Sequence, residues 1–324
     1  MSKIQIGIVG YGNLGRGVEV GLNKHSDMEL VGIFSRRDPK ILDTNSPAYS
    51  IDDILEFKEK INVLVLCGGS KSDIPKQGPE LIEHFNTVDA YDTHAQIPEY
   101  FEKMNGIAKD NKNVSVISTG WDPGLFSMNR LIQEAILPAG DTYTFWGSGV
   151  SQGHSDAVRG VDGVKKGVQY TVPDELMIER IQEGEEVDYT AKDAHARAVY
   201  VVLEEDADPA TVEKEITEMP DYFADYNTSV SFISDEEYAE EHEDMPHGGR
   251  VMRRGHTSDD HHSVMEFSLN LGSNPEFTAA VNIAYARAAY KLSENEEFGA
   301  RTVLDIPPHY LSSKSREELI KELL

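Results

Sequence analysis

The sequence contains very little of several features, and each shortage excludes a class of protein. Cys67 is the one cysteine among 324 residues, so the chain cannot form an internal disulfide. The longest unbroken apolar run is Ala198–Leu203, far shorter than the roughly 20 residues that a membrane-spanning helix needs. Met1–Gln5 leads directly into a strand-like segment, without the apolar core of a signal peptide. We therefore expect a cytoplasmic protein that does not associate with membranes.

Basic residues are also scarce. The chain has 30 of them against 57 acidic residues, which gives a formal net charge of -27. This excess of negative charge repels polyanions, so we expect neither a nucleic acid nor an anionic membrane as partner. Hydrophobic residues still make up 39% of the chain, too many for a disordered acidic segment. The acidity therefore belongs to a folded protein, whose length favours two domains.

Short β-branched runs alternate with amphipathic segments in the first third of the chain. The strand-like runs are Ile4–Val9, Leu30–Phe34, Val63–Cys67, Thr87–Tyr91 and Val114–Ser118. The helical segments between and after them are Leu14–Lys24, Ile51–Lys60, Pro75–Phe85 and Ile97–Lys109. Because strands that alternate with helices form parallel sheets, this pattern predicts an α/β fold with a Rossmann-type, doubly wound parallel sheet.

The pattern changes after residue 119. Asp-Pro-Gly within Gly120–Gly124 interrupts regular structure, and a helix-like segment, Phe126–Ile136, follows it. The turn-rich stretch beyond carries strand-like runs at Gly167–Val172, Arg197–Leu203, Ser229–Ile233 and Ser263–Leu271. We predict a first domain over residues 1–119 and a second, α+β domain over residues 120–274 with an open, largely antiparallel sheet. Residues 275–324, which begin with a helical segment, are expected to return to the first domain.

A glycine motif separates the first strand from the first helix. Gly10-Tyr11-Gly12-Asn13-Leu14-Gly15 matches G-x-G-x-x-G in this position. In such a motif the first glycine makes the tight turn, the second lets the backbone approach a pyrophosphate, and the third allows the helix to pack on the strand. The helix N-terminus then faces the anion. The sequence therefore predicts a dinucleotide-binding domain.

The end of the second strand indicates which dinucleotide binds. An enzyme that uses NAD has a carboxylate here for the ribose 2′-hydroxyl, whereas this chain has Ser35-Arg36-Arg37. Two guanidinium groups can donate charge-assisted hydrogen bonds to a 2′-phosphate. We therefore predict NADP as the cofactor, with a solvated basic pair as the alternative interpretation.

Other segments also bear on function. Gly68-Gly69-Ser70 and Asp92-Thr93-His94 follow two of the strands at the sheet edge where such folds bind ligands. Cys67 lies in an apolar run and is interpreted as core packing rather than as a nucleophile. The acidic run Asp235–Asp244 and the pair His261-His262 lack the spacing of metal ligands, so we predict no metal site.

Several motifs together resemble a known family. They are Gly10–Gly15, Phe34–Arg37, Val88–Asp92, Ser118–Gly124, Phe145–Gly147, Ser151–Asp156 and Met245–Gly249. In this order they are similar to bacterial meso-diaminopimelate dehydrogenases over essentially the whole chain. The resemblance implies NADP-dependent oxidative deamination of meso-2,6-diaminopimelate at its D-centre, which yields L-2-amino-6-oxopimelate, ammonia and NADPH. It also implies a homodimer formed through the second, substrate-binding domain, and a role in lysine and cell-wall precursor biosynthesis.

The same resemblance assigns site residues motif by motif. Asp92 and Asp122 match the carboxylates that hold the reacting amino group and are the catalytic candidates. The substrate-binding candidates are Trp121, Trp146, Gln152, Gly153, Asp156, Thr171, Arg197, His247 and Asn274. The cofactor-binding candidates are Gly10, Tyr11, Gly12, Asn13, Leu14, Gly15, Ser35, Arg36, Arg37, Gly69, Ser70, Lys71, Ser72, Asp92, Thr93, His94, Gly120, Trp121, Asp122, Pro123 and Gly124. The loop after Arg37 is longer than is usual in the family, which puts the 2′-phosphate affinity in question.

Alternatives stay open for single residues and for the whole protein. Arg197 begins an apolar strand, where a cation needs a partner, and that partner is either a substrate carboxylate or an internal acid. Asp122 is alternatively a turn former, and His247, between Pro246 and a glycine pair, a structural residue of an exposed loop. The alternative functions are another NADP-dependent reductase of the lysine or aspartate pathway and a non-catalytic NADP-sensing module.

Overall fold

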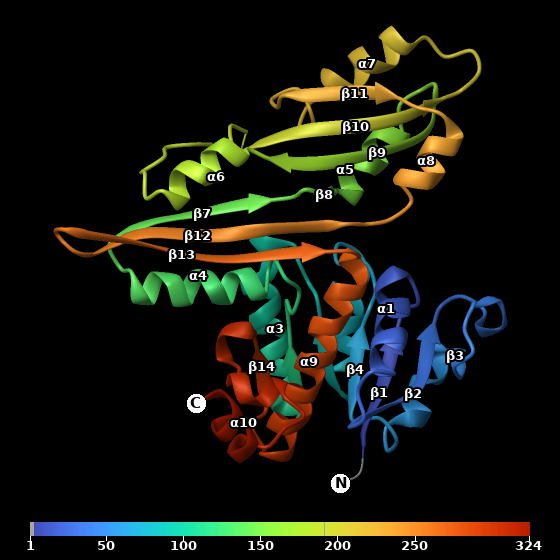
Figure 1. Cartoon of the computed structure of the whole chain (residues 1–324). Helices are drawn as coiled ribbons and strands as arrows, with labels where there is room; N and C mark the ends of the chain where they lie inside the picture. The colour runs from blue at the N-terminus through green and yellow to red at the C-terminus, as the bar shows by residue number, and fades with distance from the viewer. Residues whose placement is uncertain (1–2, 191) are drawn as a thin grey trace. The chain divides into compact units, whose positions relative to one another are not determined.

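The computed structural model describes residues 3–190 and 192–324 (Figure 1). The chain divides into two compact units, one made of residues up to 128 together with residues 275–324, and one made of residues 129–274. Each unit has its own sheets. Within the described ranges, no helix is long and apolar enough to cross a membrane.

The first unit is built on one parallel sheet. Its strand order is β14-β6-β5-β4-β1-β2-β3, and every neighbouring pair is parallel. The strands are β1 (Ile4–Val9), β2 (Met28–Ser35), β3 (Ala48–Ser50), β4 (Val63–Leu66), β5 (Asn86–Asp89), β6 (Val114–Val116) and β14 (Gly299–Arg301). Six of these strands have the doubly wound order of a dinucleotide-binding fold, with its reversal between β1 and β4. The predicted Rossmann-type sheet is confirmed.

One predicted helix of this unit has a different form in the structure. The helices of the unit are α1 (Asn13–Leu22), α2 (Ile74–Leu81), α3 (Ile97–Asp110), α9 (Asn274–Glu294) and α10 (Arg316–Leu323). The segment predicted as a helix over Ile51–Lys60 instead forms a 3₁₀-helix over Ile51–Phe57. Two turns are too short for hydrophobic spacing to distinguish a period of 3.0 residues from one of 3.6.

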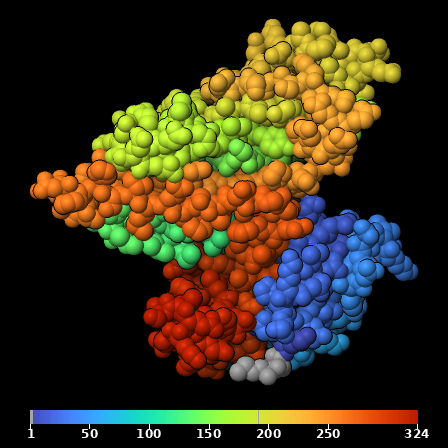
Figure 2. Space-filling view, viewed as in Figure 1, coloured from blue at the N-terminus to red at the C-terminus, as the bar shows by residue number. Residues whose placement is uncertain are grey.

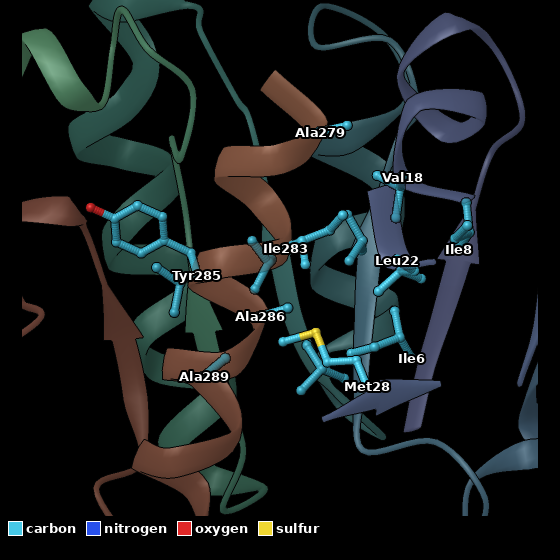
Figure 3. Close-up of a cluster of buried hydrophobic side chains, with 14 of the residues drawn as sticks. Ile6, Ile8, Val18, Leu22, Met28, Ala279, Ile283, Tyr285, Ala286 and Ala289 are labelled. Carbon is cyan, nitrogen blue, oxygen red and sulfur yellow. The ribbon is translucent and has the colours of Figure 1, made fainter. Parts of the chain in front are cut away.

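Helix α9 returns to the first unit and packs beside α1 (Figure 3). Val18 and Ile283 are fully buried in this contact, where alanines line much of α9. A Cβ atom added to Gly17 would lie 3.0 Å from the Cβ of Ala279, so the two helices approach closely. Small side chains on both helices therefore allow this packing.

The second unit contains two sheets. One has the order β11-β10-β9-β8 and the other β13-β12-β7; all pairs are antiparallel except β10 with β11. The strands are β7 (Gly140–Trp146), β8 (Gly149–Val150), β9 (Val164–Pro173), β10 (His195–Leu203), β11 (Thr228–Phe232), β12 (His247–Ser258) and β13 (His261–Leu271). The helices are α4 (Leu125–Ile136), which crosses the boundary, α5 (Gln152–Arg159), α6 (Glu175–Gln182), α7 (Pro209–Thr217) and α8 (Asp235–Glu241). The predicted α+β organisation with a largely antiparallel sheet is confirmed.

Several elements of this unit were not predicted. Ser151 is the N-cap of α5, and the residues from Gln152 to Asp156 begin that helix. His247 was placed in an exposed loop, but it is the half-buried first residue of β12. The strand was not predicted because two glycines follow His247, and glycine has low strand propensity. The acidic segment around Asp235 forms α8, which has no buried residue and lies at the surface (Figure 2).

Candidate active site

The predicted phosphate loop has the geometry that a dinucleotide requires. Gly10 has a φ of 90°, and a Cβ added to Gly15 would lie 2.3 Å from the carbonyl oxygen of Gly10. Gly12 is the N-cap of α1 without a side-chain cap, and a Cβ at this position would have no atom within 4 Å. Open space therefore lies beside the helix N-terminus, where backbone N–H groups can bind an anion.

A cavity of about 290 Å³ adjoins this loop. Seven predicted cofactor residues line it, namely Gly10, Tyr11, Gly12, Ser35, Arg36, Arg37 and Gly69. The remaining lining residues are Phe34, Ile51, Cys67, Gly68, Asp73 and Gln77. Glycine backbone at one side and two guanidinium groups at another match the pyrophosphate and 2′-phosphate of NADP, so the residues present fit that cofactor.

The two arginines of the cavity have partners within the protein. Arg36 Nη2 lies 2.9 Å from Asp73 Oδ1, and the Arg36 side chain is 67% exposed. Asp73 also accepts a hydrogen bond of 3.0 Å from the Gly69 backbone N–H. Arg37 donates one hydrogen bond from Nη2 to the carbonyl oxygen of Tyr11. Sequence reasoning missed Asp73, since no pattern links a helix N-cap residue to an arginine on another strand end.

Hydrogen bonds connect the long loop after Arg37 to the phosphate loop and α1. The Tyr11 hydroxyl donates to the Glu19 carboxylate, and Thr44 Oγ1 donates to the same carboxylate over 2.6 Å. Burial raises the pKa of Glu19, but hydrogen bonds from Ser46, Thr44 and Tyr11 outweigh it and hold the pKa below its usual value. The carboxylate of Glu19 therefore stays ionised and ties the loop to α1.

The two catalytic candidates follow neighbouring strands of the parallel sheet. Asp92 comes three residues after the end of β5, and its backbone N–H donates to Ser70 Oγ over 2.9 Å. Asp122 comes after β6, in a tight turn where a Cβ at Gly124 would lie 1.8 Å from the Gly120 carbonyl oxygen. Because β5 and β6 are adjacent and parallel, both segments leave the sheet at its carboxyl edge.

In the second unit, strand pairing aligns three of the predicted substrate residues. Arg197 on β10 is paired with Thr171 on β9, and Thr171 is paired with Gly149 on β8. A Cβ at Gly149 would lie 2.5 Å from the Cα and ring of His247, so His247 continues the row. The Asn274 backbone N–H donates to the carbonyl oxygen of Met245, two residues before His247.

Arg197 is a buried cation that has no acidic partner among the described residues. Its exposed fraction is 8%; Nη1 donates to Thr171 Oγ1 over 2.5 Å, and the guanidinium lies 4.1 Å from the centre of the Tyr226 ring. Nε is buried without a hydrogen-bond partner. Within residues 3–190 and 192–324, no ion pair to Arg197 is present, so the internal acid considered as an alternative is not found there. Burial lowers the pKa of Arg197.

Two histidines near this row are uncharged at neutral pH. Burial, together with the charge of Arg197, lowers the pKa of His154 to about 4, and Ser151 Oγ lies 2.8 Å from its Nδ1. Burial also lowers the pKa of His247, whose Nδ1 accepts the Gly248 backbone N–H over 2.8 Å. Arg197 therefore supplies the positive charge of this site.

The remaining pocket candidates lie in both units. In the first unit, Trp121 is 8% exposed and packs edge-on against Phe126. In the second unit, the Trp146 backbone N–H donates to His195 Nε2 over 2.9 Å. Gln152 and Gly153 open α5, and Asp156, on the same helix, forms an ion pair with Arg159. The predicted substrate residues therefore include one tryptophan in each unit.

Comparison with known proteins places this site in a family. Residues 120–273 match the model of the diaminopimelic acid dehydrogenase C-terminal domain. The meso-diaminopimelate D-dehydrogenase of Ureibacillus thermosphaericus is 55% identical, and the alignment covers 100% of both chains. The chain belongs to the meso-diaminopimelate D-dehydrogenase family. The relative from Corynebacterium glutamicum is 46% identical over 99% of both chains.

Solved structures of meso-diaminopimelate D-dehydrogenase relatives share the whole fold. The C. glutamicum diaminopimelate dehydrogenase in complex with DAP is 44% identical, with a TM-score of 0.91 and full coverage of both chains. An engineered D-amino acid dehydrogenase bound to NADP⁺ is 43% identical, with a TM-score of 0.86 and full coverage. The resemblance found in the sequence motifs is confirmed.

Proposed function

We propose that this protein catalyses the NADP-dependent oxidative deamination of meso-2,6-diaminopimelate at its D-centre, which yields L-2-amino-6-oxopimelate, ammonia and NADPH. The reverse reaction, a reductive amination, would serve lysine and cell-wall precursor biosynthesis. The observation that carries this proposal is Arg197, a buried cation without an acidic partner among the described residues of a meso-diaminopimelate D-dehydrogenase family member. Such a cation requires an anionic ligand, and a distal carboxylate supplies one.

The cofactor would be held by the first unit. Backbone N–H groups at Gly12 and the start of α1 would bind the pyrophosphate, and Arg36 and Arg37 the 2′-phosphate. When bound, the nicotinamide ring accepts the hydride that leaves the substrate Cα. The protein therefore needs no nucleophile of its own, which agrees with the buried Cys67, whose thiol pKa is raised by burial.

Asp92 and Asp122 would handle the reacting amino group. An ammonium has no lone pair to form the imine as hydride leaves, so it must first lose a proton. Two carboxylates stabilise the bound ammonium and can then pass its proton to water. A water molecule held nearby attacks the resulting imine carbon. Trp121 and Pro123, in the same turn as Asp122, would keep the reacting carbon in place, since a displacement of about 1 Å can cost of order 10²-fold in rate.

The second unit would recognise the unreactive L-centre. Arg197 and Thr171 would bind its carboxylate, and the remaining contacts would come from His247 and Asn274. The rest of the pocket would be formed by Trp146, Gln152, Gly153 and Asp156. Recognition of both centres explains selectivity for the meso isomer, because the LL and DD isomers would leave a buried polar group of the protein unpaired.

We infer that the enzyme works as a homodimer in the cytoplasm. The outer side of α4 supports the dimer, because it exposes three large apolar side chains, Leu131, Ile132 and Ile136, at 42% to 57%. The inner side of the same helix packs on the three-stranded sheet, where Gln133 donates to the Val251 carbonyl oxygen over 3.3 Å. An apolar stripe of this kind is typical of an oligomer interface.

The decisive experiment measures formation of reduced nicotinamide by absorbance with NADP⁺ and, separately, the meso, LL and DD isomers of diaminopimelate. We expect turnover with the meso isomer alone. Equal turnover with all three isomers, or none with any, would contradict the proposal. A protein that binds NADP⁺ but turns over no isomer would be the sensing module. Oxidation of NADPH by a cyclic lysine precursor or aspartate semialdehyde, without activity on diaminopimelate, would indicate another reductase of these pathways.

A further inference from the structure

Asp89, the last residue of β5, is a fully buried acid that the proposed chemistry does not use. Within the described ranges it forms no ion pair. Its carboxylate instead accepts three hydrogen bonds. Oδ1 accepts from the backbone N–H of Tyr91 over 3.0 Å and from that of Ser118 over 3.3 Å, and Oδ2 accepts from the Tyr100 hydroxyl over 3.0 Å. Burial of a carboxylate costs free energy, so the presence of one here requires an explanation.

The groups bound by Asp89 belong to the two segments that carry the catalytic candidates. Tyr91 directly precedes Asp92, and Ser118 begins the segment that leads to Asp122. The main chain of Asp89 adds two bonds to the second segment, because its carbonyl oxygen accepts from Thr119 N over 2.9 Å and from Thr119 Oγ1 over 3.0 Å. Asp89 thus forms hydrogen bonds with the segment that leads to Asp92 and with the segment that leads to Asp122.

The backbone of the second segment needs such a restraint. Ser118 is not a glycine, yet its φ is 58°, in the left-handed region. That conformation costs a non-glycine residue about 1–2 kcal/mol and persists only where the surroundings impose it. Here the Asp89 carboxylate binds the Ser118 N–H, and the next residue, Thr119, binds the Asp89 carbonyl group. The turn at Ser118 redirects the chain from β6 toward Asp122.

We propose that Asp89 is a positioning residue of the deamination reaction, and that it fixes the spacing of Asp92 and Asp122 by bridging the N–H groups of Tyr91 and Ser118. The inference rests on the proposed function, since it assumes that both carboxylates act on one amino group. Asp89 acts through these two backbone segments and touches no reacting atom.

The test uses three substitutions of Asp89 and one matched control. Asp89→Ala removes both bridging bonds, whereas Asp89→Asn keeps an oxygen that can accept from both N–H groups. Asp89→Ser keeps an acceptor that can reach Tyr91, two residues on, but is too short for Ser118. Thr87→Ala is the control, because Thr87 is also fully buried on β5 and its Oγ1 donates over 3.1 Å to Ser115 Oγ. It links β5 to β6 in the body of the sheet, away from the site.

We expect Asp89→Ala to lower kcat on meso-diaminopimelate by about 10-fold to 100-fold, the order of loss that a misplacement near 1 Å produces. KM for NADP⁺ should change less than kcat, because the phosphate loop and the two arginines lie outside the segments that Asp89 binds. Asp89→Asn should restore kcat to within threefold of wild type, and Thr87→Ala should keep it there while lowering Tm. If Asp89→Ala does not fold, Asp89→Ser carries the test, with most of the kcat loss expected.

The positioning role would be refuted if the folded Asp89→Ala or Asp89→Ser variant turned over as fast as Thr87→Ala. It would also be refuted if Asp89→Asn lost as much kcat as Asp89→Ala, because the amide oxygen preserves the bridge. Inactivity of the wild-type protein on meso-diaminopimelate would instead overturn the proposed function. The two failures are therefore distinguishable in one set of assays.

Discussion

Replacement of Arg197 by leucine should separate substrate binding from protein stability. The guanidinium is desolvated, has an unpartnered Nε, and within the described residues has no carboxylate to offset its burial. Its contacts include Thr171 Oγ1 and the Tyr226 side chain. The folded protein therefore buries this cation at a cost in free energy. An ion pair with the substrate carboxylate would offset that cost.

The size of each effect follows from these contacts. A buried charged hydrogen-bonded pair is worth about 2–5 kcal/mol when one partner is removed, so Arg197→Leu should lower kcat/KM for meso-diaminopimelate by about 10²-fold to 10³-fold. The free energy of unfolding should change by less than about 1 kcal/mol, because the lost contact with Tyr226, about 1–2 kcal/mol, is offset by relief of desolvation. One substitution should thus abolish most activity without unfolding the protein.

Arg253 provides the matched control. It is also buried, at 5% exposure, but its guanidinium donates to the Leu137 carbonyl oxygen over 2.6 Å, to Thr142 Oγ1 over 2.7 Å and to the Pro138 carbonyl oxygen over 3.1 Å. Arg253→Leu leaves these acceptors without their donor, so it should lower the free energy of unfolding by about 2–4 kcal/mol. Urea unfolding measures the free energy of unfolding of both variants, and kcat/KM for meso-diaminopimelate is measured at saturating NADP⁺. Both quantities are then compared between Arg197→Leu and Arg253→Leu.

A second substrate isolates the carboxylate. D-Lysine has the reacting end of meso-diaminopimelate but no distal carboxylate, so Arg197→Leu should change its rate by less than about threefold. The reasoning fails if the variant keeps kcat/KM for meso-diaminopimelate within threefold of wild type. It fails equally if Arg197→Leu is destabilised as much as Arg253→Leu, because Arg197 would then be a structural residue.

Two further predictions concern the first unit. Arg36→Ala and Arg37→Ala should each lower the affinity for NADP⁺ at least tenfold while changing that for NAD⁺ little, as measured by fluorescence titration; an unchanged NADP/NAD preference in both variants would remove the assignment of the 2′-phosphate site. Burial raises the pKa of Asp89 from 3.8 to about 6, so its protonation favours the folded state. Relative to Asp89→Asn, the free energy of unfolding of wild type should therefore be highest below about pH 4 and fall by up to about 3 kcal/mol as the pH rises through 6. Urea unfolding between pH 4 and 7.5 measures this difference, and no change across that range would contradict it.

The sequence was informative where the deciding physics is local. The parallel sheet follows from strands such as Ile4–Val9 that alternate with amphipathic helices, and the turn at Gly10 requires a glycine because of its positive φ. Arg36 and Arg37 were predicted to bind the 2′-phosphate because they stand at a fixed position after a strand. The family resemblance added residues whose motifs are individually weak, such as Asn274.

Sequence patterns were less informative where backbone and side-chain signals disagree. Strand β12 was missed because its first residues include Gly248 and Gly249, and because Arg253 is a charged residue on a buried strand position. The helix that begins at Gln152 was not predicted for a similar reason, since Gly153 lowers helix propensity at its start. In both places tertiary packing overrides local propensity.

The sequence by itself therefore determined the layers of the first unit, the phosphate loop and the expectation of a 2′-phosphate on the cofactor, because each depends on residues close together in the chain. Tertiary structure alone decided that Arg36 meets Asp73, that Arg197 lacks an acidic partner among the described residues, and that Asp89 joins the segments of Asp92 and Asp122. Those facts depend on strand register and on the packing of segments distant in sequence. No local pattern encodes them, because the energy of a buried charge is set by all the groups that surround it.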